Sequence, residues 1–291
     1  MTKTDKMLAT KEGRVGIMTF NNPEKRNAVS YEMWEADEAI LKDFAADPDI
    51  RVVVLTGAGG KAFVSGADIS KFESERATEE ATQRYNGLVE RIYSHIYTFE
   101  KPTIAMIRGF CIGGGLNLAI CCDMRYATAE SRFALPAAKL GLGYGYPGLR
   151  RYIDTIGAPV TKEIFFTARQ FDTEQALRWG VINHIVADDR LEATVMETAN
   201  MIADNAPMTI KTIKMSTVEA LRDPADRNLK RCAEAVAACF ASQDYKESRA
   251  KRRVMGLHFY FSHLPPHPNP LPMGEGAVRR GSPWQFIIRG A

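Results

Sequence analysis

The stretch Ser-Gly-Ala-Asp-Ile at residues 65–69 and the triple glycine at residues 113–115 decide how this chain is interpreted. A short, apolar, β-rich run precedes each of them, at 51–56 and at 103–107, and residues of helical character follow each. A strand that ends in a glycine turn before a helix exposes backbone N–H groups at the helix N-terminus. The sequence therefore predicts two turns with free backbone donors.

The two turns predict one divided oxyanion hole if they meet in space. One N–H from Ala67 and one from Gly114 would then hold a carbonyl oxygen while it becomes an enolate. Losing one such donor typically lowers a rate by about 10²–10³. The alternative is that both are ordinary tight turns, because glycine is the usual residue wherever φ is positive.

Further motifs occur in a fixed order around the two turns. They are 22–28 (NPEKRNA), 61–63 (KAF), 122–123 (CD), 133–136 (FALP) and 140–141 (LG). This ordered series resembles the crotonase, or enoyl-CoA hydratase/isomerase, superfamily from about residue 10 to residue 251. A single triple glycine would be a weak signal, whereas the series is specific.

The resemblance implies an α/β fold, a crotonase-like spiral of ββα repeats followed by a C-terminal helical segment. It implies an acyl-CoA substrate and a homotrimer or hexamer. Coenzyme A would enter as part of the thioester, with no tightly bound cofactor. We expect a spiral core at 1–195, a helical oligomerisation segment at 196–255 and a proline-rich tail at 256–291.

Hydrophobic periodicity independently predicts alternating strands and helices. An N-cap at Ser30 starts a helix whose apolar stripe is Met33, Ile40, Leu41 and Phe44. Strands are expected near 15–19, 51–56, 103–107, 124–127 and 182–186, and amphipathic helices at 78–99, 190–205, 207–221 and 226–242.

Composition favours a cytoplasmic enzyme and argues against several other classes. The formal net charge of +3 over 291 residues, without a basic stripe, gives no support for nucleic-acid binding. Residues 1–13 lack an apolar segment, and no apolar run approaches the roughly 18 residues of a membrane span. Five cysteines without a paired spacing predict free thiols, and sparse histidines predict no metal site.

Two positions depart from the pattern of the hydratases in the superfamily. The resemblance places catalytic glutamates where this chain has Asn117 and Ala137, and neither side chain can act as a carboxylate base. No Asp or Glu occurs between Lys101 and Cys122 or between Glu130 and Asp154. One positioned acid–base group contributes about 10²–10⁴ in rate, so we expect only a trace of hydratase activity.

Three interpretations of the chemistry are open. The first is an acyl-CoA lyase that stabilises a thioester enolate without the glutamate pair. The second is a methylmalonyl-CoA-type decarboxylase, since the loss of CO₂ creates an enolate without a base, and Tyr144 matches a tyrosine of those decarboxylases. The third is a catalytically silent acyl-CoA-binding or assembly subunit. Tyr144 can orient a carboxylate or donate a proton, or it can simply pack the glycine-rich loop.

The roles of several other polar residues near the predicted site are also open. Asn117 either faces the pocket or satisfies neighbouring backbone. A carboxylate delivered from the covering helix by Glu79, Glu80 or Glu90 is a further alternative.

The resemblance assigns coenzyme A contacts to two stretches. These residues are Lys25, Arg26, Ala28, Ser65, Gly66, Asp68, Ile69 and Lys71. A solvated turn is the alternative for the first stretch, and Asp68 can instead cap the following helix. In this sequence Ser70 stands before Lys71, where hydratases often have the lysine directly.

The tail differs in composition from the rest of the chain. Six of the fourteen prolines fall between residues 265 and 283, which predicts an extended or disordered segment. It is either a displaced native end without a catalytic role or a proline-rich ligand for another protein.

Overall fold

The computed structural model describes residues 4–71, 75 and 77–254. The chain divides into two units at residue 246. The fold and the candidate site belong to the first unit. The predicted proline-rich tail lies outside the described residues.

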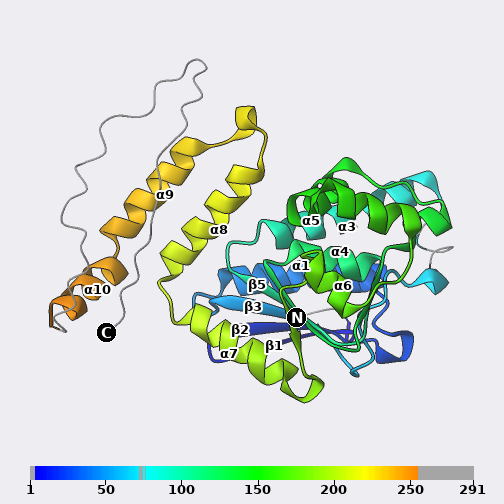
Figure 1. Cartoon of the computed structure of the whole chain (residues 1–291), viewed down its shortest axis with the longest axis horizontal. Helices are drawn as coiled ribbons and strands as arrows, with labels where there is room; N and C mark the ends of the chain where they lie inside the picture. Colours follow the sequence, from blue (N-terminus) through cyan, green and yellow to red (C-terminus); the bar gives the residue numbers. More distant parts are fainter. Residues whose placement is uncertain (1–3, 72–74, 76, 255–291) are drawn as a thin grey trace. The chain divides into compact units, whose positions relative to one another are not determined.

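A six-stranded sheet organises the first unit (Figure 1). Its order is β1-β2-β3-β5-β7-β9, in which β1 pairs antiparallel with β2 and the other pairs are parallel. The strands are β1 (Met7–Glu12), β2 (Val15–Phe20), β3 (Val52–Gly57), β5 (Thr103–Ile107), β7 (Met124–Thr128) and β9 (His184–Val186). The expected strands are confirmed, and β1 is an additional one.

The central strands β3 and β5 are buried on both faces, which explains their continuous apolar runs. Val52 and Val54 of β3 pack with Leu191 and Val195 of α7 on one face. The alternate residues of β3, including Leu55, join the larger core on the other face. Figure 1 shows α7 below the sheet and α1 and α4 above it. The α/β expectation is therefore confirmed, with helical layers on both faces.

A second, three-stranded parallel sheet positions the two glycine turns. Its order is β4-β6-β8, and its strands are β4 (Ala62–Val64), β6 (Phe110–Ile112) and β8 (Arg132–Ala134). Runs 51–56 and 103–107 do precede the turns, but the short strands β4 and β6, which were not predicted, lie between each run and its turn. These strands are only three residues long, too short to show a periodic pattern.

The helices expected at 78–99, 190–205, 207–221 and 226–242 agree with the structure within a few residues, whereas those at 146–167 and 173–178 had no predicted range. Ser30 precedes α1, whose stripe of Met33, Ile40, Leu41 and Phe44 is buried, as expected. The helices are α1 (Tyr31–Ala46), α3 (Glu79–Tyr97), α4 (Gly114–Cys121), α5 (Tyr146–Thr167), α6 (Thr173–Arg178), α7 (Leu191–Ala203), α8 (Pro207–Leu221), α9 (Leu229–Ala241) and α10 (Gln243–Val254).

The C-terminal helical region is confirmed. Helices α8 and α9 pack against each other. The predicted division at residues 195 and 255 stays a prediction.

Candidate functional site

The two glycine turns meet at one edge of the small sheet. Strands β4 and β6 are parallel neighbours, so the turns at 65–69 and 113–115 leave the sheet on the same side. A Cβ atom built on Gly114 would lie 3.7 Å from the Cα of Gly66 and 3.9 Å from the backbone nitrogen of Ala67. The sequence expectation that the turns come together is thus realised in the backbone.

The backbone nitrogens of Ala67 and Gly114 make no hydrogen bond to any part of the chain that the structure describes. The neighbours of Ala67 are committed, because Val29 N donates to Gly66 O and Asp68 N donates to Val29 O, each at 2.9 Å. Within the described residues, no carbonyl or side chain accepts from the N–H of Ala67 or of Gly114. Gly114 also begins α4, where N–H groups have no partner within the helix.

Glycine is required at two positions of the second turn. Gly113 has φ +55°, a conformation that costs an L-residue energy. A Cβ on Gly115 would lie 2.0 Å from the carbonyl oxygen of Val64. The missing side chain lets α4 pack directly against β4, which brings the start of α4 to the first turn.

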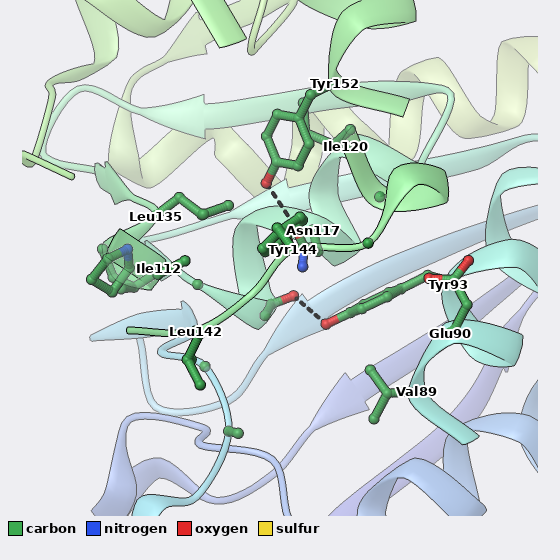
Figure 2. Close-up of a pocket in the computed structure, with 18 of the residues that line it drawn as sticks. Val89, Glu90, Tyr93, Ile112, Asn117, Ile120, Leu135, Leu142, Tyr144 and Tyr152 are labelled. Atoms are coloured by element: carbon green, nitrogen blue, oxygen red, sulfur yellow. Dashed lines mark hydrogen bonds between the residues drawn. The ribbon is translucent and has the colours of Figure 1, made fainter. Parts of the chain in front are cut away.

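A cavity of about 300 Å³ opens beside the two turns. Its wall comes from the turns, from α3, α4 and the first half of α5, and from the loop before α5 (Figure 2). Most of the wall is apolar, including Trp34, Val89, Ile112, Ile120, Leu135 and Leu142. Such a mostly apolar cavity with a few convergent polar groups is typical of a small-molecule site.

Asn117 is the central polar group of the cavity. Its Oδ1 accepts a hydrogen bond from Tyr152 Oη at 2.7 Å and a second from Tyr144 Oη. Figure 2 shows Asn117 beside Tyr144 and Tyr152, with its amide nitrogen directed away from the Tyr152 hydroxyl. Two hydroxyl donors fix the amide orientation, so Asn117 presents an N–H donor to the cavity.

The tyrosines around Asn117 are protonated donors. Burial raises the pKa of Tyr144, although the hydrogen bond to Asn117 acts in the opposite sense. Burial also raises the pKa of Tyr152 and of Tyr93. The Tyr93 hydroxyl donates to the carbonyl oxygen of Gly114 at 3.2 Å, so the second turn is anchored to α3.

Ala137, the other departure from the hydratase pattern, lines the same cavity. Of the three glutamates left open on the covering helix, Glu90 reaches the wall, whereas Glu79 and Glu80 do not line it. The Glu90 carboxylate accepts from Nη2 of Arg151 at 2.8 Å. The one carboxylate among the described wall residues is therefore already paired.

The residues expected to contact coenzyme A gather at the first turn. Lys25 Nζ donates to Asp68 at 2.8 Å and to Ser70 at 2.7 Å. Burial alone would raise the pKa of Asp68, but its hydrogen bonds with Lys25 and Ser70 lower the pKa overall. The guanidinium of Arg26 lies over the ring of Phe110, 5.0 Å from its centroid. Lys25 and Arg26 thus have protein partners already.

The other residues expected to contact coenzyme A lie in the cavity wall and in the segments next to the first turn. Ser65 and Gly66 line the cavity, and the carbonyl of Ala28 accepts from Asn22 Nδ2 at 2.9 Å. Asp68 accepts from the backbone N–H of Ser70 at 3.1 Å. Lys71 ends the short 3-10 helix η2 (Ile69–Lys71), and the side chain of Ile69 lies outside what the structure describes.

Sequence reasoning missed Tyr93, Tyr152 and Arg151. Tyr93 lies on the apolar side of the predicted 78–99 helix, so its periodicity was available as a signal. No local pattern links Tyr152 or Arg151 to Asn117, because only the fold brings α5 beside α4.

The described residues contain neither a candidate metal site nor a helix that could span a membrane. In residues 4–71, 75 and 77–254, no group of three or more His, Cys, Asp or Glu side chains is arranged to hold a metal ion. No helix within those ranges has the length and apolar character needed to cross a bilayer.

Comparisons with known proteins agree on one family. Residues 10–267 match the family model described as enoyl-CoA hydratase/isomerase. The chain is 32% identical to the short-chain-enoyl-CoA hydratase of Clostridium acetobutylicum over 255 residues, which cover 86% of this chain and 97% of that protein. It is 32% identical to the carnitinyl-CoA dehydratase of Citrobacter koseri over 211 residues, or 70% of this chain and 77% of that protein.

A solved structure shows the same architecture. The enoyl-CoA hydratase from Bacillus anthracis superposes with a TM-score of 0.81 at 25% identity, covering 86% of this chain and 97% of that one. The predicted crotonase-like fold is confirmed by this similarity.

Proposed function

Because the chain belongs to the enoyl-CoA hydratase/isomerase family, we propose that it is a lyase that binds an acyl-CoA thioester in this cavity and stabilises its enolate. The N–H groups of Ala67 and Gly114 form the proposed oxyanion hole. The reaction we propose is the loss of CO₂ from a malonyl-type thioester, which needs no carboxylate base.

The hydrogen bonding of Asn117 carries this proposal. A neutral amide cannot take a proton from water at ordinary pH, and its oxygen already accepts from Tyr144 and Tyr152. Ala137 offers no polar atom at the second glutamate position. The cavity therefore supports chemistry that generates an enolate without first removing a proton.

The oxyanion hole would act on the charge that develops during this step. When the bond between the α-carbon and the carboxylate breaks, its electron pair passes to the α-carbon and the thioester oxygen, and CO₂ leaves. Free, preorganised N–H donors in an apolar cavity stabilise that charge, each by roughly 2.7–4 kcal/mol. The α-carbon then takes up one proton to give the product thioester.

We assign two roles to the polar wall. The amide N–H of Asn117 holds the departing carboxylate. The hydroxyl of Tyr144, which donates to Asn117 Oδ1 in this structure, would turn to the α-carbon and supply the proton. Tyr144 suits this assignment because its raised pKa keeps it protonated across the physiological range. Solvent would restore its proton between turnovers.

The nucleotide portion of coenzyme A would lie outside the cavity. We propose that Ser65, Gly66, Asp68, Ile69 and Lys71 approach the cofactor from the first turn. Lys25, Arg26 and Ala28 would face its phosphates from the adjoining segment. Lys25 would then share its ammonium between Asp68 and a phosphate.

Hydration is the second candidate function. One observation favours it, namely the carboxylate of Glu90 in the cavity wall. In that case Glu90 would activate water, as a substitute for the missing glutamates. Its ion pair with Arg151 weighs against this role, because both carboxylate oxygens of Glu90 already accept from Nη2 of Arg151.

The proposal is tested by incubating the purified full chain with methylmalonyl-CoA and measuring propionyl-CoA and CO₂ by mass spectrometry. We expect one CO₂ for each propionyl-CoA formed. Absence of CO₂ release at all enzyme concentrations would contradict the decarboxylase assignment.

The variant Tyr144→Phe tests whether the Tyr144 hydroxyl takes part in the reaction. It removes one hydroxyl and keeps the ring that packs on Phe165. We expect a loss of about 10²-fold or more in the rate of CO₂ release, since one positioned proton donor contributes that much. An unchanged rate would exclude Tyr144 from the chemistry.

A further inference from the structure

The cavity has one charged end, formed by Glu90 on α3 and Arg151 on α5. Nη2 of Arg151 lies 2.8 Å from each carboxylate oxygen of Glu90. The Arg151 side chain is only 8% exposed, whereas that of Glu90 is 43% exposed. Within the described cavity wall these two residues are the charged ones, in surroundings that are otherwise neutral and mostly apolar.

Arg151 retains unused hydrogen-bond donors. Among the described residues, Nη2 is the only side-chain nitrogen of Arg151 that makes a hydrogen bond, so Nε and Nη1 are unengaged. A guanidinium presents a planar array of donors that suits a carboxylate. Glu90 balances the positive charge without using all of the donors, so a second anionic group could bind at the same guanidinium.

This charged end lies away from the proposed oxyanion hole. Glu90 precedes Tyr93 by one helical turn on α3, and the Tyr93 hydroxyl meets the Gly114 carbonyl. Figure 2 shows Glu90 beside the backbone end of Tyr93, at the opposite end of that side chain from the hydroxyl. An acyl chain whose thioester lies at Gly114 would need several carbon atoms to reach Arg151.

We propose that Arg151 binds a carboxylate at the far end of the acyl group. The substrate class is then a coenzyme A thioester whose acyl chain, or the substituent on its α-carbon, ends in a carboxylate. This inference rests on the proposed function, which places the thioester at Gly114. It adds a second recognition point that the chemistry at the thioester does not require.

Two saturated thioesters of equal chain length test the inference by calorimetric titration of the full chain. Glutaryl-CoA ends in a carboxylate and pentanoyl-CoA ends in a methyl group. Neither carries a carboxylate on the α-carbon, so the proposed decarboxylation cannot consume them. We expect glutaryl-CoA to bind about tenfold more tightly, the typical contribution of one charge-assisted hydrogen bond.

Glu90→Gln is the decisive variant, because it removes the competing carboxylate and leaves Arg151 in place. We expect it to increase the preference for glutaryl-CoA by about a further tenfold. The double variant Glu90→Gln, Arg151→Gln places an uncharged side chain at both positions, and it should bind both thioesters equally. Glu90 is half-exposed, so the single variant tests the inference even if the double variant does not fold.

The outcomes separate this inference from the proposed function. Equal binding of the two thioesters by the wild type, together with no preference in Glu90→Gln, would overturn the role of Arg151. CO₂ release from methylmalonyl-CoA would be unaffected by that result. Failure to bind either thioester, together with no CO₂ release from methylmalonyl-CoA, would overturn both, since the acyl group would then not occupy this cavity.

Discussion

At the scale of single residues, Asn117 determines what the cavity can do. The sequence predicts that an amide replaces a carboxylate at this position. It does not predict that Tyr144 and Tyr152 both donate to the amide oxygen, because 27 and 35 residues separate them from Asn117. The sequence alone thus predicts that position 117 has lost its acid–base group. The direction of the Asn117 amide N–H could be known only from the fold.

Restoring both carboxylates should restore hydration. In the double variant Asn117→Glu, Ala137→Glu we expect crotonyl-CoA hydration to rise by about 10²-fold or more over the wild type. The rate is followed by the loss of enoyl-thioester absorbance. The matched control Asn117→Gln, Ala137→Gln has the same side-chain lengths without charge, and equal activation by that control would refute the account.

Gly114 should tolerate no side chain. A Cβ there would lie 3.1 Å from the Tyr93 hydroxyl and would fill the space between the turns. We expect Gly114→Ala to lower CO₂ release by about 10²-fold, because the thioester oxygen could no longer approach the donors. Gly87→Ala on α3 is the control, since its Cβ would make only ordinary contact with Arg91. If Gly114→Ala retained the wild-type rate, the oxyanion assignment would be wrong.

At the scale of elements, the short strands were harder to predict than the helices. Strands β4 and β6 have three residues each, and they are recognised only because they pair with each other. By contrast, the stripe on α1 was evident from its helical spacing. The same helix contains a residue that its amphipathic pattern does not explain, the buried Asp37.

Asp37 should make α1 sensitive to pH. Its side chain is fully buried, and neither carboxylate oxygen has a hydrogen-bond partner in the described structure. Burial raises its pKa to about 8. The folded state then holds a proton that the unfolded chain releases near pH 4, so stability falls as pH rises from about 4 to about 8. The slope contributed by this group is at most about 1.4 kcal/mol per pH unit.

Asp37→Asn should remove this pH dependence. We expect the variant to gain free energy of unfolding relative to the wild type at pH 8, and to gain less at pH 5. Urea denaturation at the two pH values measures the difference. Glu35→Gln, an exposed position on the same helix, is the control. A pH-independent difference between Asp37→Asn and the wild type would contradict the assigned protonation.

At the scale of the whole molecule, the family resemblance and the periodicity together predicted the layered core and the C-terminal helices. They could not predict which residues of α5 reach the cavity, since that depends on how distant elements pack. Helices α8 and α9 retain exposed apolar side chains, including Ile213, Leu229 and Phe240. Exposed apolar side chains on neighbouring helices are typical of protein–protein contact surfaces.

We predict that these side chains lie in subunit contacts of a homotrimer or hexamer. Phe240→Asp should shift the sedimentation coefficient from that of the oligomer toward that of a single chain, because it would bury a charge in the contact. Lys230→Gln on the same helix should have no such effect. A wild-type protein that sediments as a monomer would contradict this prediction.

The most direct test of the central claim is a competition between two reactions in one preparation. The wild-type chain is incubated with equal amounts of crotonyl-CoA and methylmalonyl-CoA, and the products are followed by mass spectrometry. We expect propionyl-CoA to accumulate while only a trace of 3-hydroxybutyryl-CoA forms. Rapid formation of 3-hydroxybutyryl-CoA without propionyl-CoA would show that another group replaces the two glutamates, and it would contradict the account.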